Sequence, residues 1–336
     1  MAKAVKTWVI HALGLLVAAS ACLAGAMADT KPVYTTPPSE VAAMTPAELN
    51  AFGLRLMTES YTIKSRVTRV EDEGDDEGKA DPAVVEAVKT LYDDDALIQR
   101  ARLNYGLTKS TYYPHEFKGF EITNLVLTRS TDTVLIVSFN IKLPKRVSLR
   151  SGIVMSGESM PRIMVLRWSD RDGMWKIFTH ADFDTPKTFL CGSNPGYLPE
   201  KSAFRAADIA LATQLLEKMQ AASLSGTEKS VQSKGFQYVL ASGERKTAPG
   251  AVRAKMKGHA EPRNIEAILS GDLLAMRYDA QSTMTLDGGA LEHELRPGLM
   301  TFHKDSDGEW RMIAIAIFSV TAKLAKDVVC VEPKSN

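Results

Sequence analysis

Residues 160–184, MPRIMVLRWSDRDGMWKIFTHADFD, show the pattern of a β-hairpin. Apolar and polar residues alternate on both sides of the turn at residues 169–173, which ends in Asp-Gly. A similar stretch, RPGLMTFHKDSDGEWRMIAIAIF, stands at residues 296–318. Pro161 corresponds to Pro297, and the spacing is nearly constant through the whole hairpin. The same hairpin present twice indicates the same domain present twice.

The bulk composition agrees with a soluble protein of two domains. The chain has 336 residues, a length that favours about two domains. Its hydrophobic fraction of 45% and charged fraction of 24% are ordinary for a globular protein. The formal net charge of +1 gives no electrostatic reason to expect nucleic acid as a partner.

The N-terminal segment, residues 1–28, has the features of a signal peptide. Lys3 and Lys6 precede a short apolar run, and the segment ends in the A-x-A sequence that closes at Ala28. We therefore expect cleavage after Ala28 and a periplasmic or secreted protein. The apolar run is too short for a stable membrane span. The alternative is a lipoprotein at Cys22, but the residues before it match a lipobox poorly.

The rest of the chain divides into two units of similar order. We expect a linker at residues 29–44, a first domain at residues 45–188, a linker at residues 189–200, a second domain at residues 201–325 and a tail at residues 326–336. Each unit begins with amphipathic helical segments and ends in antiparallel strands. The sequence Thr-Pro-Ala-Glu from Thr45 predicts the start of the first helix. The fold class predicted for both units is α+β.

Several segments resemble the nuclear transport factor 2-like (NTF2-like) superfamily, and its DUF4440/SnoaL-like branch in particular. They are YDDDA at residues 92–96, FKGFEI at residues 117–122, DGMWKIFTH at residues 172–180 and DGEWRM at residues 307–312. The resemblance implies two tandem cone-shaped domains, each with N-terminal helices packed on a curved antiparallel sheet. Members of the superfamily include isomerases, dehydratases and binding domains, so the resemblance does not select an activity.

The resemblance also implies partners. A cone of this kind encloses a cavity that can hold a small apolar or weakly polar ligand. Superfamily members pair through the open face of the sheet, so the two units are expected to pair within one chain, and a homodimer is a further possibility. The isomerase-like enzymes use a tyrosine and carboxylates in the pocket, but those positions cannot be matched here residue by residue.

His180 is the strongest candidate for chemistry. Strand alternation places it on one face with Lys176, Phe178 and Asp182. His180 is then a candidate general base, with Asp182 orienting its ring. The alternative is that the pair forms polar surface. In the second unit, isoleucines stand at both positions, the first being Ile315.

Three further residues are candidates for ligand binding. Arg162 begins the repeated hairpin and could hold a ligand carboxylate, although a surface arginine explains it equally simply. Tyr61 and Tyr92 lie near the ends of predicted helices, where they face either a cavity or the core. We expect a binding protein rather than an enzyme. The alternatives are an isomerase- or dehydratase-like enzyme using His180 and Asp182, and a purely structural tandem module.

Cysteine usage predicts one disulfide and no metal centre. If the protein is exported and loses its signal peptide, Cys191 and Cys330 remain, each just beyond the last strand of its unit. We expect them to pair. Glu292, His293 and Glu294 are consecutive, so in an extended segment they point to alternate faces and cannot converge on one ion. No cofactor-binding motif is present, and we expect no cofactor.

Overall fold

The computed structural model describes most of the chain after the predicted signal peptide. The described residues are 31–67, 69–70, 79–101, 103, 105–112, 114, 117–144, 146–147, 153–155, 157–183, 188–190, 201–250, 260–282, 295–318 and 329–331. The predicted signal peptide, residues 1–28, and Cys191 lie outside these ranges. No helix among the described residues combines the length and apolar character needed to cross a bilayer.

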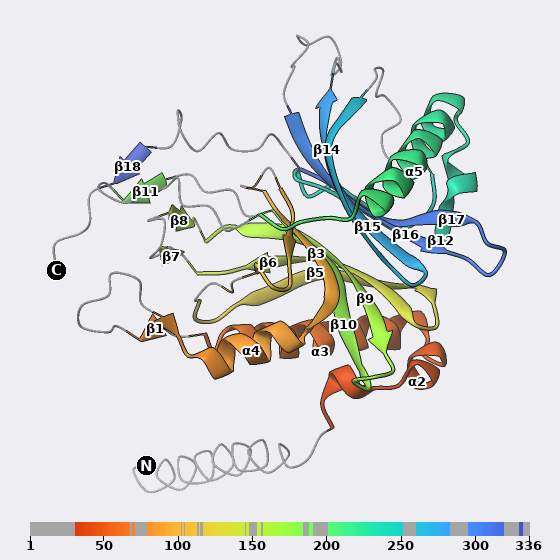
Figure 1. Ribbon diagram of the computed structural model, residues 1–336. Coiled ribbons are helices and arrows are strands. Elements are labelled where there is room, and N and C mark those ends of the chain that lie inside the picture. Colours follow the sequence, from red (N-terminus) through yellow and green to blue (C-terminus); the bar gives the residue numbers. More distant parts are fainter. Residues whose placement is uncertain are drawn as a thin grey trace, which may run out of the picture.

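The helices of the first unit cover one face of its sheet (Figure 1). They are η1 (Val33–Thr35), α2 (Pro38–Ala42), α3 (Pro46–Lys64) and α4 (Pro82–Thr90). Helix α3 begins where the sequence predicts. The Glu48 N–H donates to Thr45 Oγ1 at 3.3 Å, and the Thr45 N–H donates to Glu48 Oε2 at 2.8 Å. This capping box pairs two of the backbone donors that a helix start leaves open.

The segment predicted as a linker, residues 29–44, belongs to the first unit from Val33 onward. It forms η1 and α2 instead of an open connection. Tyr34 and Val41 are buried, and Trp175 Nε1 donates to the Thr36 carbonyl oxygen at 2.8 Å. The prolines that indicated a linker serve as helix starts here, since proline is tolerated in the first turn.

The sheet of the first unit has six strands. They are β3 (Tyr92–Arg100), β4 (Leu107–Thr108), β5 (Glu121–Thr131), β6 (Val134–Lys142), β9 (Ser159–Ser169) and β10 (Met174–Asp182), in the order β4-β3-β10-β9-β6-β5. Strands β9 and β10 are the predicted hairpin. Strands β3 and β10 are parallel, and the other neighbours are antiparallel. Tyr92 is the first residue of β3, opposite Ile177, and does not continue the preceding helix.

The second unit repeats this plan. It consists of α5 (Ala206–Ser225), η2 (Glu228–Val231), β12 (Gln232–Leu240), β13 (Arg245–Lys246), β14 (Ala260–Ser270), β15 (Leu273–Ser282), β16 (Leu295–Lys304) and β17 (Trp310–Ile317). The strand order, β13-β12-β17-β16-β15-β14, corresponds strand by strand to that of the first unit. The predicted fold class, two α+β units built in tandem, is therefore confirmed.

Irregularities of the two sheets also repeat. Strands β5 and β14 each carry a bulge with an asparagine in the left-handed region, Asn124 with φ 52° and Asn264 with φ 50°. Asparagine tolerates this region better than most residues. Strand β10 skips Phe178 in its register, and β17 skips Ile313. Bulges redirect a strand, so their repetition shows that both sheets bend at the same places.

The bulge at Phe178 corrects one sequence prediction. An unbroken alternation would place Phe178 on the same face as His180. Because the bulge shifts the alternation by one residue, Phe178 instead packs in a cluster between the two units, whereas Trp175 and Ile177 face the helices. His180 then lies on the helix-covered face, inside the cone of the first unit.

The two units pack with the open faces of their sheets together, above and below one another in Figure 1. Buried apolar residues of β3, β6, β9 and β10 join those of β12, β15, β16 and β17 in one cluster. At its edge the ring of Phe183 stacks on the ring of Phe318, with centroids 4.4 Å apart. Thr179 Oγ1 and Thr301 Oγ1 share a hydrogen bond of 3.0 Å. The chain thus forms an intramolecular domain pair.

Short strands form two smaller sheets. Strand β1 (Arg69–Val70) pairs with β2 (Lys79–Ala80), and a second sheet has the order β18-β11-β8-β7, formed by β18 (Val329–Val331), β11 (Thr188–Leu190), β8 (Ile153–Met155) and β7 (Arg146–Val147). Strands β11 and β18 are parallel, with Leu190 opposite Val331. The short strands that follow the main sheet of each unit, β11 and β18, are therefore paired with each other.

The disulfide between Cys191 and Cys330 stays a prediction, because Cys191 lies outside the described residues. The β11–β18 pairing supports it: Cys330 lies opposite Phe189, two residues before Cys191 in the chain. We expect peptide mapping of unreduced protein to find one peptide that joins both cysteines. Two freely alkylated thiols in protein purified from an oxidising compartment would contradict the prediction.

Candidate functional site

The cone of the first unit holds a small cavity between α3 and the concave face of the sheet. Its volume is about 40 Å³, which is room for a few water molecules or one small polar group. The lining is mostly polar and aromatic: Tyr61, Lys64, Arg100, Tyr112, Pro114, Phe117, Leu143, Arg162, His180 and Asp182. The charged side chains come from one helix and three adjacent strands, so the backbone of the cone holds them in place.

A chain of hydrogen bonds runs along one wall of the cavity. Lys64 Nζ donates to Tyr92 Oη at 3.0 Å, and Tyr92 Oη lies 3.0 Å from His180 Nδ1. With Nζ as the donor to Oη, the tyrosine hydrogen is available for Nδ1, and this direction assigns the imidazole proton to Nε2. The His180 side chain is 4% exposed, and Nε2 has no hydrogen-bond partner among the described residues.

Asp182 does not orient His180 as the sequence suggested. Its Oδ1 forms an ion pair with Nη2 of Arg162, at a distance of 3.1 Å across the β9–β10 hairpin. Arg162 is 2% exposed, and its guanidinium also donates to the Pro161 carbonyl oxygen. The partner that holds the ring of His180 is Tyr92. In place of the expected carboxylate–histidine pair, the structure has a hydrogen bond between Tyr92 and His180 and a separate buried ion pair between Arg162 and Asp182.

The structure brings together all five predicted site residues. Tyr61, Arg162, His180 and Asp182 line the cavity, and Tyr92 is bonded to two of its lining residues. Their roles in binding or catalysis stay predictions.

Two charged lining residues were missed, Lys64 and Arg100. Lys64 follows Tyr61 at a spacing of three, so it continues the buried face of α3. Arg100 follows Ile98 at a spacing of two, on the same face of β3. Both signals place a charge on a buried face, a pattern that points to a functional site.

Burial and charge shift the protonation of these groups. The pKa of Lys64 falls to about 7, chiefly through burial and then through the nearby Arg162 and Arg100; Asp182 opposes the shift. The pKa of His180 lies well below its ordinary value because of burial and the same positive charges, so the imidazole is neutral. Burial raises the pKa of Tyr92, which stays protonated.

Lys64 makes stability depend on pH. The folded protein releases its proton near pH 7, and the unfolded chain holds it until about 10.5. Within this window the unfolded state binds more protons, so the free energy of unfolding should rise with pH, by up to about 1.4 kcal/mol per pH unit. Arg100, Arg162 and Asp182 face the amine from three strands, and the neighbouring His180 is neutral.

Urea unfolding at several pH values in this window measures the effect. In the Lys64→Met variant the free energy of unfolding should rise less with pH, because the titrating amine is gone. Lys218→Met is the matched control, since Lys218 is about half exposed and pairs with the exposed Glu309. If the free energy of unfolding rises equally steeply with pH in the wild type and in Lys64→Met, Lys64 is not the group that causes the pH dependence.

The second unit does not repeat the charged lining. Strand register makes Ile315 the counterpart of His180 and Leu240 the counterpart of Arg100. Gly298 corresponds to Arg162, and the ring of Tyr278 fills the space beside it: a Cβ on Gly298 would come within 2.5 Å of that ring. The same fold thus carries a charged cone in one unit and an apolar one in the other.

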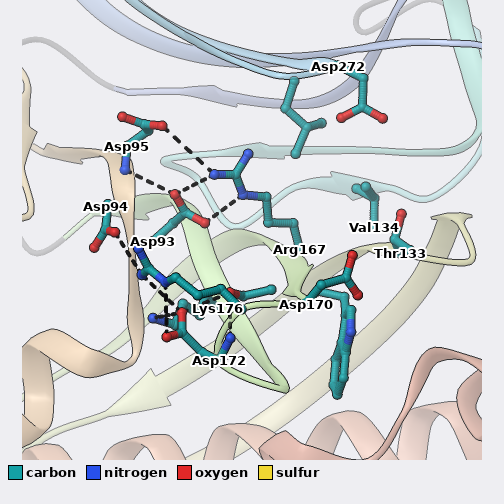
Figure 2. A pocket seen from close by; sticks show the side chains of 14 residues that line it. Asp93, Asp94, Asp95, Thr133, Val134, Arg167, Asp170, Asp172, Lys176 and Asp272 are labelled. Carbon is teal, nitrogen blue, oxygen red and sulfur yellow. Dashed lines mark hydrogen bonds and ion pairs between the residues drawn. The ribbon is translucent and has the colours of Figure 1, made fainter.

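A second hollow, of about 410 Å³, lies where the hairpin of the first unit meets the β14–β15 turn of the second (Figure 2). Six aspartates and three basic residues line it. Figure 2 shows Arg167 bonded to Asp93, at 2.5 and 2.7 Å, and Lys176 paired with Asp172 at 2.5 Å. Among the described residues no group of side chains suits a metal ion. The carboxylates of Asp93 and Asp172 therefore already pair with basic side chains of the protein.

No protein-family model matches the sequence, and no curated protein matches it. Similar solved structures include an NTF2-like protein from Cytophaga hutchinsonii, at 16% identity and a TM-score of 0.29, over 35% of this chain and 100% of that chain. A putative ketosteroid isomerase from Shewanella frigidimarina has 14% identity and a TM-score of 0.28, over 34% and 99%.

A third similar structure is an NTF2-like superfamily protein from Salmonella enterica, at 12% identity and a TM-score of 0.28, over 35% of this chain and 94% of that chain. Each match covers about a third of the chain, the size of one unit. The three neighbours are thus two NTF2-like proteins and one putative ketosteroid isomerase.

Proposed function

We propose that the first unit binds a small molecule through an anionic group, in the cone cavity. The observation that carries this proposal is the charge of the lining. Lys64, Arg100 and Arg162 are each at most 5% exposed, and Asp182 is the one carboxylate among the cavity-lining residues. The Nε2–H of His180, for which the described residues offer no hydrogen-bond partner, adds a neutral donor.

The chemistry of the lining revises the expected ligand. The lining carries three basic side chains and one carboxylate, so an anionic group complements its charge better than an apolar or weakly polar molecule does. A carboxylate offers two oxygens that match the guanidinium geometry of arginine. The small volume limits the enclosed part to a group of this size, with any larger part of the ligand outside.

Saturation-transfer NMR with propionate as the probe tests this proposal. We expect propionate to bind the wild type, and Arg100→Leu to weaken binding by about tenfold or more, because a charge-assisted hydrogen bond is lost. Leucine is the residue that the second unit carries at this position, so the fold accepts it there. Arg171→Gln is the control, since that side chain is 68% exposed. Absence of binding to the wild type would overturn the proposal.

An enzyme is the second candidate. It is favoured by the neutral His180, which lines the cavity and whose Nε2 has no hydrogen-bond partner in the part of the chain that the structure describes. With the proton assigned to Nε2, His180 presents a hydrogen-bond donor at that atom, and the role of general base stays a prediction. His180→Ile copies the second unit. Turnover of a carboxylate substrate that survives this change would exclude a catalytic role for His180.

Export to the periplasm or medium, through cleavage after Ala28, stays part of this proposal. The support is the order of charged, apolar and small residues within residues 1–28. Intact mass of the mature protein decides it, because a chain that retains residues 1–28 would contradict export by this route. A homodimer of the tandem chain also stays a prediction, for which the measurement is the mass in solution.

A further inference from the structure

We propose that Lys64 is a carbonyl-reactive amine that forms an imine with a small 2-oxo acid in the cone of the first unit. The carboxylate of that acid would lie against Arg100 and Arg162, and its carbonyl carbon would face Lys64 Nζ. This inference rests on the anion site proposed above and adds the substrate class and a covalent step to it.

The position of Lys64 supports the proposal. It is the last residue of α3, and its side chain is 3% exposed at the wall of the cavity. Its Nζ lies 4.8 Å from the ring centroid of Tyr61 and 5.0 Å from that of Tyr92. Among the described residues no carboxylate forms an ion pair with it; its hydrogen-bond partner is the neutral Tyr92 hydroxyl. A surface or structural lysine has no need of such a setting.

The charges around Lys64 favour the free amine. Burial and two neighbouring guanidiniums lower its pKa to about 7, so a large fraction is unprotonated at neutral pH. Only the unprotonated amine attacks a carbonyl, and desolvation beside another cation is an established way to supply it. The same guanidiniums attract the anionic half of the substrate, so one arrangement serves both the nucleophile and the binding.

The covalent step balances without an outside oxidant or reductant. The Nζ lone pair adds to the carbonyl carbon, and a proton passes from nitrogen to the carbonyl oxygen. The resulting hydroxyl leaves as water after taking up a second proton, and the C=N bond forms. Tyr92 bonds Nζ and His180 in series, at 3.0 Å each, and can pass protons between the amine and the imidazole.

Reductive trapping tests the step. The full chain is incubated with pyruvate and sodium cyanoborohydride, then digested and mapped by mass spectrometry. We expect one carboxyethyl group, on Lys64, formed about tenfold or more faster than on exposed lysines such as Lys218. Lys64→Arg keeps the positive charge and should abolish this modification. Mapping of the unaltered chain decides the question even if the variant fails to fold.

Propionate separates this inference from the proposed function, because it has the carboxylate but no carbonyl. Propionate that binds and slows trapping at Lys64 supports both. Propionate that binds while Lys64 stays unmodified overturns the imine and leaves the anion site standing. If neither acid binds, both proposals fall. Modification spread evenly over exposed lysines, with Lys64 no faster than the others, also overturns the imine.

Discussion

Phe318→Ala is expected to lower the free energy of unfolding by about 3–5 kcal/mol, the range for truncating a fully buried phenylalanine. Phe318 is 1% exposed and stacks on Phe183, which is equally buried, with an interplanar angle of 19°. The loss should be large because this pair joins the two units, so the cavity opens in the packing between the sheets.

Denaturant unfolding measures the effect, and Leu224→Ala is its control. Leu224 is 76% exposed, so its truncation should change stability by less than about 0.5 kcal/mol. A double-mutant cycle with Phe183→Ala isolates the stacked pair, because the two residues are in direct contact. A loss below about 1 kcal/mol for Phe318→Ala would mean that the sheets do not pack on each other in solution.

Asp182→Asn is expected to lower the free energy of unfolding by about 3 kcal/mol, the lower end of the range for breaking a buried ion pair. The substitution removes the negative charge that lies 3.1 Å from the buried guanidinium of Arg162, and the 17% exposure of the Asp182 side chain keeps the loss of stability at the lower end. It should also lower the pKa of Lys64 further, because Asp182 is the carboxylate that raises it.

Denaturant unfolding and the pH at which pyruvate is trapped measure these two effects. Asp307→Asn is the matched control. It breaks the ion pair between the half-exposed Asp307 and Arg311 in the second unit and should lower the free energy of unfolding far less than Asp182→Asn does. The double variant Arg162→Met/Asp182→Leu should regain most of the stability, since an apolar pair avoids the desolvation cost. An unchanged free energy of unfolding in Asp182→Asn would refute a buried ion pair between Arg162 and Asp182.

Local signals in the sequence determined the two units and their hairpins. The turn at residues 169–173, its later copy, and the capping box at Thr45 each depend on residues close in the chain, so periodicity and turn chemistry predict them. The repetition then required the same fold twice. It also revealed that His180 has an apolar counterpart, Ile315.

The tertiary structure decided how the site is assembled. Parallel pairing of β3 with β10 brings Tyr92 to His180 across a long stretch of chain, which no local pattern encodes. The bulge at Phe178 shifts the hairpin register by one residue and sets Asp182 opposite Arg162. Side chains alternate between faces with a period of two, so a one-residue shift decides which of them enter the cone.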